Sequence, residues 1–499
     1  MRRYLRKLRQ ILTPSTSLTQ QSIAGGVWMG LTNVLSRGLQ IVMVLILANL
    51  LTPGQFGLMG IALLVISAIN RSTRLGLNDA LIYNENKNVN AYLNTAWMLN
   101  IGRGIILAGI IFILAPFLSK VFGEPRTASI LPVMALGPLV YGFRNPGIVY
   151  FKKKLKFRRQ FIFEVSGAVA QFVIAVGFAV VSQTVWALVV GYLATSWTRT
   201  ITSYFLHDYS PRPTFDLSLA KELVDYGKWV TGSHALSFIK NEGDDAFIGW
   251  FLAAASLGYY QMAYRLANAP ATEISHVVSG VAFPAYSKIQ DDPEALRSGF
   301  LRVVSLSTLI AFPAGIGIAV VAPTFTQVFL GSEWLPMVLT MQLFALYGTC
   351  RAFVSTFGSV WRAVGRPDLQ TKMQAVSIVG MGIGIYPATQ AYGIAGAAAT
   401  ILLINVVLML PLNVYVTVKE IEISVFDLFS EVIYPTTASA IMGIVVLFVS
   451  NKLILSWAAL EFVVLVVVGM VTYLGAVAVL ETRFNWGLRA ELRAIQDAI

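Results

Sequence analysis

The chain has 499 residues, of which 56% are hydrophobic and 12% are charged, and its mean hydropathy is +0.69. A soluble globular chain carries about 25% charged residues, so this composition argues against a soluble enzyme or binding domain. A single cysteine excludes an intramolecular disulfide and a cysteine metal cluster, and the three histidines (His207, His234 and His276) form no metal-ligand motif.

The N-terminal residues 1–22 are basic, beginning "MRRYLRKLRQ", but no apolar h-region or small-residue cleavage site adjoins them. We therefore predict a retained cytoplasmic segment that lies on anionic lipid, and no signal peptide. The net charge of +12 would suit a nucleic-acid partner. In so apolar a chain it is better explained by the excess of Lys and Arg in the cytoplasmic loops of membrane proteins, and we predict no nucleic-acid partner.

Apolar stretches of membrane length follow one another along the rest of the chain. About 20 predominantly apolar residues suffice to cross a bilayer as a helix. We predict an all-α membrane protein with 14 transmembrane helices, at residues 23–50, 55–77, 91–118, 128–150, 160–181, 184–206, 225–251, 256–285, 298–322, 335–362, 370–390, 393–417, 428–450 and 455–480.

The connectors alternate in charge. Those after the second, fourth, sixth, eighth and tenth segments are basic, and the strongest is "KKKLKFRR" at 152–159. Those after the first, fifth, seventh and eleventh are short and carry no Lys or Arg. Because basic loops remain in the cytoplasm, both termini are expected there and the number of spans must be even.

The sequence also repeats itself at an offset of 201 residues. "VWMGLTNVLSR" (27–37) aligns with "KWVTGSHALSF" (228–238), and "LTPGQFGLMGIA" (51–62) aligns with "LAAASLGYYQMA" (252–263). A unit with six spans re-enters the membrane from the same side, so the copies should be related by a pseudo-two-fold axis along the membrane normal.

This repeat predicts the domain organisation. Two six-helix lobes are followed by two additional helices: a cytoplasmic N-terminal segment (1–22), an N-lobe (23–206), a cytoplasmic linker (207–224), a C-lobe (225–417), helices 13 and 14 (418–481) and a cytoplasmic tail (482–499).

Arginines occur inside several of these spans. Arg37, Arg103 and Arg351 lie near the middle of theirs, whereas Arg144 and Arg265 lie nearer an end. Each mid-span arginine would cost about 2.5–3.5 kcal/mol if it faced lipid. We therefore expect them to face a hydrated cavity, where guanidinium suits an anionic substrate such as a diphosphate. The alternative is that each arginine pairs with a buried acid and holds helices together. At the cytoplasmic end of the second segment, Arg71 and Arg74 are better explained by snorkelling.

The intramembrane acids are concentrated in "FIKNEGDDAFIGW" (238–250). Lys240 and Asp244 can pair on one helical face, which leaves Glu242 and Asp245 without an obvious local partner. A carboxylate in a membrane cavity can take up a proton or a sodium ion and couple an ion gradient to movement. An equally weighted alternative is a charge network that braces this helix against Arg265 or Arg351.

The opening "GGVWMGLTNVLSRGLQIVMVLILANLLTPGQFGLMGIALLVISAINRSTRLGLNDALI" (25–82) resembles Wzx-type flippases of the polysaccharide transporter family, especially the colanic-acid and teichuronic-acid exporters. "LAAASLGYYQMAYRLAN" (252–268) and "YGIAGAAAT" (392–400) extend the resemblance over essentially the whole chain. The superfamily also holds multidrug and toxin extruders and lipid II flippases.

The resemblance implies two six-helix lobes around a central cavity that opens alternately to either side of the plasma membrane. The implied substrate is an oligosaccharide on a polyprenyl diphosphate carrier, flipped from the inner to the outer leaflet for surface polysaccharide synthesis. Basic cavity residues are a family trait, assigned here to Arg37, Arg103, Arg144, Arg265 and Arg351. Ion coupling by analogy with lipid II flippases would fall to Asp244 or Asp245. A polysaccharide polymerase and glycosyltransferases are the implied partners.

Two other functions share parts of this pattern. Drug extrusion uses the same fold, but its usually cationic substrates favour an acidic or aromatic chamber. A membrane polymerase or ligase should have a sizeable external loop, and here the external connectors are short. The sequence contains no Walker A, GxSxG or HExxH motif. We therefore predict a transporter, and neither an enzyme nor a protein with a cofactor or a metal site.

Overall fold

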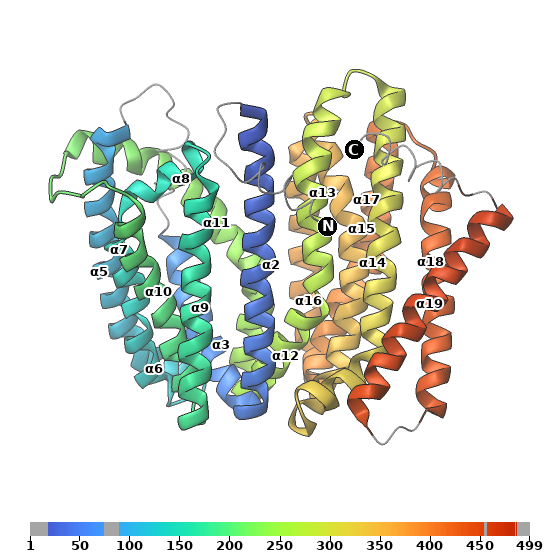
Figure 1. Cartoon of the computed structure of the whole chain (residues 1–499), viewed down its shortest axis with the longest axis horizontal. Coiled ribbons are helices and arrows are strands. Elements are labelled where there is room, and N and C mark those ends of the chain that lie inside the picture. The colour runs from blue at the N-terminus through green and yellow to red at the C-terminus, as the bar shows by residue number, and fades with distance from the viewer. Residues whose placement is uncertain (1–17, 74–88, 454–456, 485, 487–499) are drawn as a thin grey trace, which may run out of the picture. The chain divides into compact units, whose positions relative to one another are not determined.

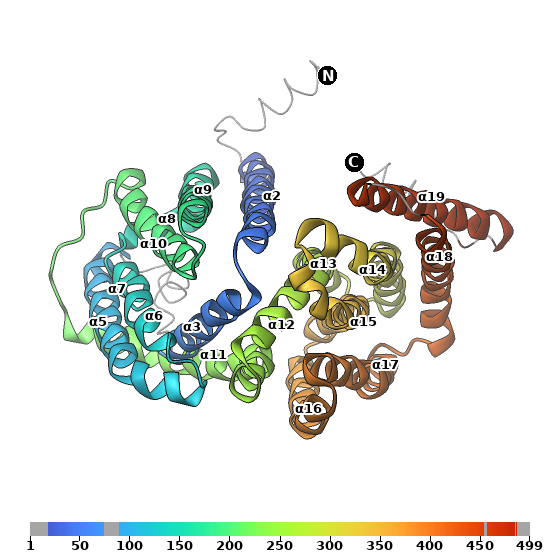
Figure 2. The same ribbon diagram turned by 90° about the horizontal axis from the view of Figure 1, so that it is seen from below.

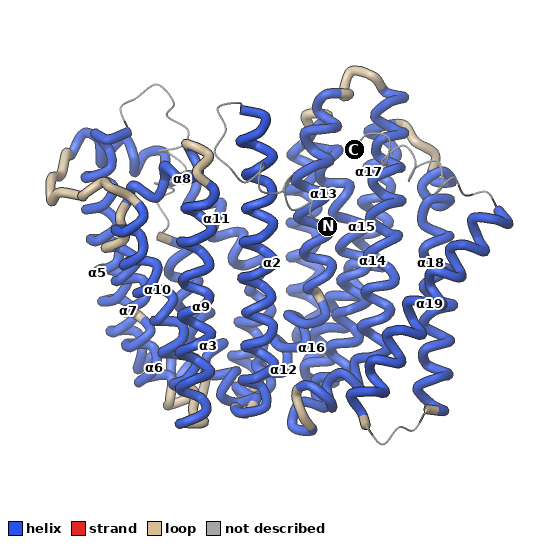
Figure 3. The backbone as a smooth tube through the Cα atoms, in the orientation of Figure 1, coloured by secondary structure: helices blue, strands red, loops and turns tan. Residues whose placement is uncertain are grey.

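The computed structural model describes residues 18–73, 89–453, 457–484 and 486, and the elements of this part of the chain are helices (Figure 3). Residue contacts divide the chain into two compact units, a first unit at 1–258 and a second unit at 259–499. Residue Arg74 and most of the predicted terminal segments lie outside the described residues.

The first unit contains long helices and a region of short ones (Figure 1). Its elements are α2 (Leu18–Leu50), α3 (Pro53–Ser72), α5 (Val89–Val121), α6 (Thr127–Met134), α7 (Leu136–Gly142), η1 (Pro146–Ile148), α8 (Val149–Lys153), α9 (Phe157–Val181), α10 (Trp186–Leu206) and α11 (Leu217–Phe251). In two views α9 lies between α2 and α10 (Figures 1 and 2).

The second unit begins inside α12 and continues to the end of the chain. Its elements are α12 (Ala254–Ala267), α13 (Ala269–Lys288), α14 (Pro293–Phe329), η2 (Ser332–Met337), α15 (Val338–Ala363), α16 (Pro367–Leu403), η3 (Ile404–Met409), α17 (Leu410–Ile421), α18 (Val425–Lys452) and α19 (Ala458–Phe484). A hydrophobic core lies among α13, α14 and α15, where Phe300, Phe357 and Trp361 are buried together.

Within the described residues, each of the predicted apolar segments is mainly helical. Among the described residues, nine helical stretches are long and apolar enough to cross a membrane, so the chain is a multi-pass membrane protein. Local signals set several boundaries. Thr52 begins α3 with a capping box to Gln55, and Asp216 caps α11 through the amides of Ser218 and Leu219. The second cap makes residues 217–224, which we had assigned to the linker, helical.

Three predicted segments depart from straight helices. Residues 128–150 form the short elements α6 to α8, and residues 256–285 divide at Asn268 into α12 and α13. In α16, Gly393 has a φ of 57°, and the chain reverses there. A methyl group at Gly396 would overlap the carbonyl oxygen of Ala388, and one at Gly384 would lie 2.8 Å from Thr400. These contacts, arranged symmetrically about residue 392, describe an antiparallel helical hairpin at the predicted boundary between the eleventh and twelfth segments.

Parts of the repeat-related sequences, residues 53–57 and 254–258, touch each other within the first unit. A methyl group at Gly57 would overlap the carbonyl oxygen of Ala254, and one at Gly258 would overlap the carbonyl oxygen of Pro53. In the sequence alignment Gly57 corresponds to Gly258, and Pro53 corresponds to Ala254. The two contacts are therefore reciprocal, and both need a residue without a side chain.

Candidate functional site

An ion pair inside the first unit joins two helices within their apolar stretches. Arg199 Nη2 of α10 lies 2.7 Å from Glu164 Oε2 of α9, and the two side chains are 28% and 33% exposed. The sequence makes room for the pair at Gly167, where a methyl group would lie 2.6 Å from Arg199 Nε. Glycine at this position thus lets the arginine stem lie along α9 and reach the carboxylate one turn away.

A second arginine adjoins this pair. The guanidinium carbon of Arg144 lies 4.4 Å from the ring centroid of Tyr141 and 5.2 Å from that of Phe163, which are cation–π distances. Arg144 also interacts electrostatically with Glu164 and Arg199. Its Nε is buried without a hydrogen bond in the described part of the chain. Glu164 pairs with Arg199, and Arg144 lies near both, so the cluster of Arg144, Arg199 and Glu164 holds two guanidinium groups and one carboxylate and has an excess positive charge.

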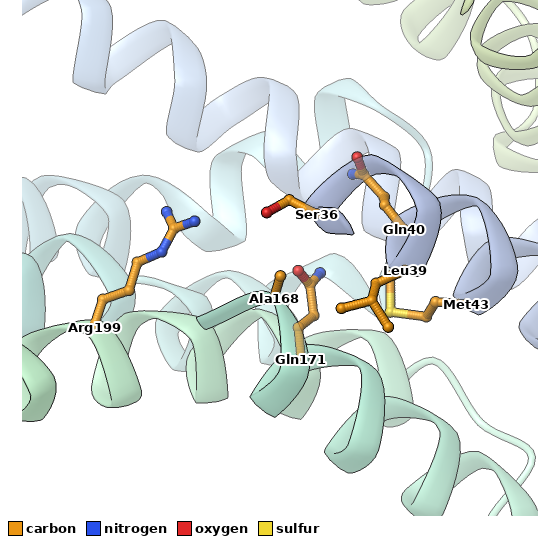
Figure 4. A pocket seen from close by; sticks show the side chains of 7 residues that line it. All are labelled: Ser36, Leu39, Gln40, Met43, Ala168, Gln171 and Arg199. Atoms are coloured by element: carbon orange, nitrogen blue, oxygen red, sulfur yellow. The ribbon is translucent and has the colours of Figure 1, made fainter. Parts of the chain in front are cut away.

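A pocket of about 140 Å³ opens beside Arg199, between α2, α9 and α10 (Figure 4). Ser36 Oγ and Arg199 Nε are buried and make no hydrogen bond among the described residues. Its lining combines apolar, amide, hydroxyl and guanidinium groups from Ser36, Leu39, Gln40, Met43, Ala168, Gln171 and Arg199.

Arg103 binds the end of a neighbouring helix. It donates from Nη2 to the carbonyl oxygen of Asn70 at 2.9 Å, to the side-chain oxygen of the same residue, and from Nε to Thr73 Oγ1 at 3.3 Å. These partners lie at the C-terminus of α3, where carbonyl groups have no intrahelical donor and the helix dipole is negative. Arg103 therefore caps α3.

The acidic helix α11 also contacts α3. Glu242 Oε1 lies 2.9 Å from Arg71 Nη2, so these two residues, which we had treated separately, form an ion pair. Asp244 is 8% exposed, and Asp245 is half-buried. The predicted pairing of Lys240 with Asp244, and ion binding by Asp244 or Asp245, stay predictions.

The predicted cationic residues of the second unit occupy different environments. Arg351 on α15 donates from Nη1 to the hydroxyl of Tyr264 at 2.9 Å and from Nη2 to Thr272 Oγ1 at 2.5 Å. It thereby joins α15 to α12 and α13. Arg265 is exposed on α12.

Of the predicted arginines in the first unit, Arg144 joins the cluster of Arg144, Arg199 and Glu164, and Arg103 occupies a separate place at the end of α3. Arg37 is half-buried on α2, next in sequence to the pocket residue Ser36. The convergence of all five predicted arginines on one cavity stays a prediction.

Our sequence reasoning missed Arg199 and Glu164. Each lies within a predicted span, so an ionisable residue at membrane depth was available as the signal. Their separation of 35 residues matches no local spacing rule, and only the register of α9 against α10 brings them together.

The basic connector at 152–159 packs against the end of α10. Arg159 Nη1 donates to the carbonyl oxygen of Leu206 at 2.7 Å, and the His207 ring stacks on Tyr150 with centroids 5.6 Å apart. Burial lowers the pKa of His207; nearby Arg159, Lys156 and Lys154 act in the same direction and Asp208 opposes them. His207 Nδ1 accepts the amide hydrogen of Tyr209 at 3.0 Å, which suits a neutral imidazole.

Sequence comparisons give consistent relatives. A family model described as "Polysaccharide biosynthesis protein" matches residues 46–339. The chain is similar to the lipopolysaccharide biosynthesis protein WzxC of Escherichia coli (27% identity over 81% of this chain and 82% of that protein). It is also similar to the teichuronic acid biosynthesis protein TuaB of Bacillus subtilis (24% identity, covering 87% and 90%).

Solved structures share the fold at low sequence identity. The lipid II flippase MurJ in an inward closed conformation superposes with a TM-score of 0.73 at 12% identity, covering 92% of this chain and 99% of that one. An inward-facing multidrug resistance transporter of the MATE family gives a TM-score of 0.59 at 14% identity, covering 80% and 98%.

Proposed function

This chain belongs to the polysaccharide biosynthesis protein family, and we propose that it is a flippase for polyprenyl-diphosphate-linked oligosaccharides. It moves the repeat unit from the inner to the outer leaflet for synthesis of a cell-surface polysaccharide. Relatives named as polysaccharide biosynthesis or transport proteins support transport over catalysis. A lipid II flippase among the solved structures with the same fold supports it as well.

The observation that carries the proposal is the excess positive charge of the cluster of Arg144, Arg199 and Glu164. Positive charge inside an apolar helix bundle is costly unless it is hydrogen-bonded or has an anionic ligand. Arginine presents a planar fork of donors that matches a diphosphate and keeps its charge at every physiological pH. Diphosphate binding by Arg144, and by Arg37, Arg103, Arg265 and Arg351 during the transport cycle, belongs to this proposal.

The transport mechanism that we propose is alternating access by two six-helix lobes related by a pseudo-two-fold axis, with 14 spans in all. The reciprocal contacts of Gly57 with Ala254 and of Gly258 with Pro53 support such an axis. A two-fold interface has this property, because residue i touches residue j while the equivalent of j touches the equivalent of i. Close backbone contact without side chains also allows two helices to tilt against each other.

The cellular setting follows from the same function. The protein acts in the plasma membrane with both termini in the cytoplasm, alongside the glycosyltransferases that build the repeat unit and the polymerase that joins it. Coupling to sodium or protons is assigned to the acids of α11, Glu242, Asp244 and Asp245, of which Glu242 is ion-paired with Arg71.

The direct test is a transfer assay with the purified protein in liposomes. A fluorescent polyprenyl-diphosphate sugar is placed in the membrane, and an impermeant quencher reports the fraction in the outer leaflet. We expect faster exchange than in protein-free liposomes, and slower exchange with Arg144→Gln. A sodium or proton gradient imposed in parallel identifies the coupling ion. Exchange no faster than in protein-free liposomes would contradict the function.

A further inference from the structure

We propose that the pocket between α2, α9 and α10 binds one sugar residue of the transported lipid-linked oligosaccharide. This inference rests on the proposed function and adds to it a place where the glycan is recognised. The arginines account for the diphosphate, whereas the pocket has the chemistry of a site for hydroxyl groups.

The pocket is polar on some sides and apolar on others. Ser36, Gln40 and Gln171 offer a hydroxyl and two amides, which together can both donate and accept hydrogen bonds. Leu39 and Met43 supply apolar surface from the same turns of α2. A sugar ring has the matching character, since hydroxyl groups surround its edge and C–H groups cover its faces.

The charge of the pocket also favours a sugar over a phosphate. Among the described lining residues, Arg199 is the ionisable one, and its Nη2 is engaged by Glu164 at 2.7 Å. Its Nε remains buried without a hydrogen bond among the described residues, as does Ser36 Oγ. Buried polar groups in native proteins are nearly always satisfied by protein, water or ligand. Ser36 Oγ and Arg199 Nε therefore have hydrogen-bonding capacity that the described residues do not use.

The size of the pocket limits its occupant. Its volume is about 140 Å³ and it is open on one side, so a sugar ring can enter while the rest of the oligosaccharide stays outside. The pocket therefore binds a single residue of the repeat unit. Arg144, which belongs to the positively charged cluster, lies close enough to the pocket residue Arg199 for the two guanidinium groups to interact.

The test separates recognition of the sugar from recognition of the carrier. Purified protein in nanodiscs is titrated with a panel of polyprenyl diphosphates, each carrying one hexose or N-acetylhexosamine, and with the same carrier without sugar. Gln171→Leu and Gln40→Leu remove amides from α9 and α2, and Ser36→Ala removes the hydroxyl. Gln390→Leu, at an exposed position on α16, is the matched control. Size-exclusion profiles and thermal unfolding verify folding, and the three variants on two helices guard against the loss of any one.

We expect the wild type and Gln390→Leu to bind at least one sugar-bearing carrier more tightly than the bare carrier. Each pocket variant should lose about threefold to tenfold in affinity for that ligand, the effect of one hydrogen bond, and retain its affinity for the bare carrier. Equal losses for both ligands, or no loss in any folded variant, would overturn the sugar site and leave the flippase function intact. Failure of the wild type to bind either carrier would overturn the proposed function itself.

Discussion

Replacing Glu164 with glutamine should destabilise the protein and increase its affinity for anions. The carboxylate lies 2.7 Å from Arg199 Nη2, and both side chains are about one-third exposed. At an effective dielectric constant of about 20 the Coulomb energy of such a pair is about 6 kcal/mol, most of which desolvation and side-chain ordering offset. Exposed pairs contribute about 0–1 kcal/mol, and breaking a buried pair costs about 3–5 kcal/mol. We therefore expect Glu164→Gln to lower the free energy of unfolding by about 2 kcal/mol.

The same substitution removes the carboxylate of the cluster of Arg144, Arg199 and Glu164. Both guanidinium groups then act on any anion that enters, and one additional effective charge interaction of about 1.4 kcal/mol gives about tenfold tighter binding. Arg199→Gln removes a cation and should weaken both stability and anion binding. The two variants therefore change stability in the same direction and anion affinity in opposite directions.

The measurements are thermal unfolding of the purified protein and titration with a polyprenyl diphosphate that carries no sugar. Asp291→Asn makes the same change of charge in an exposed connector and serves as the control. The double variant completes a thermodynamic cycle, in which we expect a coupling energy of about 1–2 kcal/mol. Weaker anion binding by Glu164→Gln, or a coupling energy near zero, would refute this account of the cluster.

Three further predictions concern other parts of the molecule. Alanine at Gly57 or Gly258 should lower the free energy of unfolding by about 1–3 kcal/mol, because the added methyl group overlaps a backbone oxygen. In the control Gly382→Ala the methyl group meets open space, and stability should not fall. Equal thermal stability of all three variants would contradict the close contact. The neutral His207 ring stabilises the fold above its unfolded pKa of about 6.5, and this stabilisation is lost as the pH falls through the lower folded pKa. The difference in free energy of unfolding between the wild type and His207→Gln should therefore shrink between about pH 8 and pH 5. A difference that stays constant with pH would contradict the neutral state of the ring. Arg351→Lys keeps the charge but loses the planar pair of donors to the hydroxyls of Tyr264 and Thr272. The free energy of unfolding should fall by about 1–2 kcal/mol, while transfer of the lipid-linked sugar persists. Unchanged stability would exclude a role of Arg351 in joining α15 to α12 and α13.

Most of the helical architecture could be predicted from the sequence because membrane-length apolar runs leave the backbone few alternatives to a helix. The apolar pattern predicted the positions of the helices, and the predicted boundary between the segments at 370–390 and 393–417 falls at the hairpin at Gly393. The division of 256–285 at Asn268 was not predicted, since α13 continues directly after it with Pro270 in a permitted first-turn position. Likewise Asp216 extends α11 toward the N-terminus through residues too polar for a hydropathy pattern to include.

The candidate site was harder to predict because its contacts join distant parts of the chain. Arg144 was recognised as an intramembrane charge, but its neighbours Arg199 and Glu164 come from α10 and α9 and depend on the register of those helices. Similarly, Arg71 and Glu242 are separated by 171 residues. Spacing rules identify partners within a helix at three or four residues, and they contain no information about which face of one helix meets another.

The arginine contacts show how a membrane protein can keep cations without neutralising them. Arg351 donates to the hydroxyl groups of Tyr264 and Thr272, so these hydrogen bonds lower the cost of burial and leave the charge in place. Arg71 and Arg199 instead face carboxylates, which cancel most of their field. A lipid-linked diphosphate must be held during passage and then released, which suits cations whose protein partners are neutral or shared. Acids placed directly against every arginine would give a more rigid bundle and leave no attraction for the substrate.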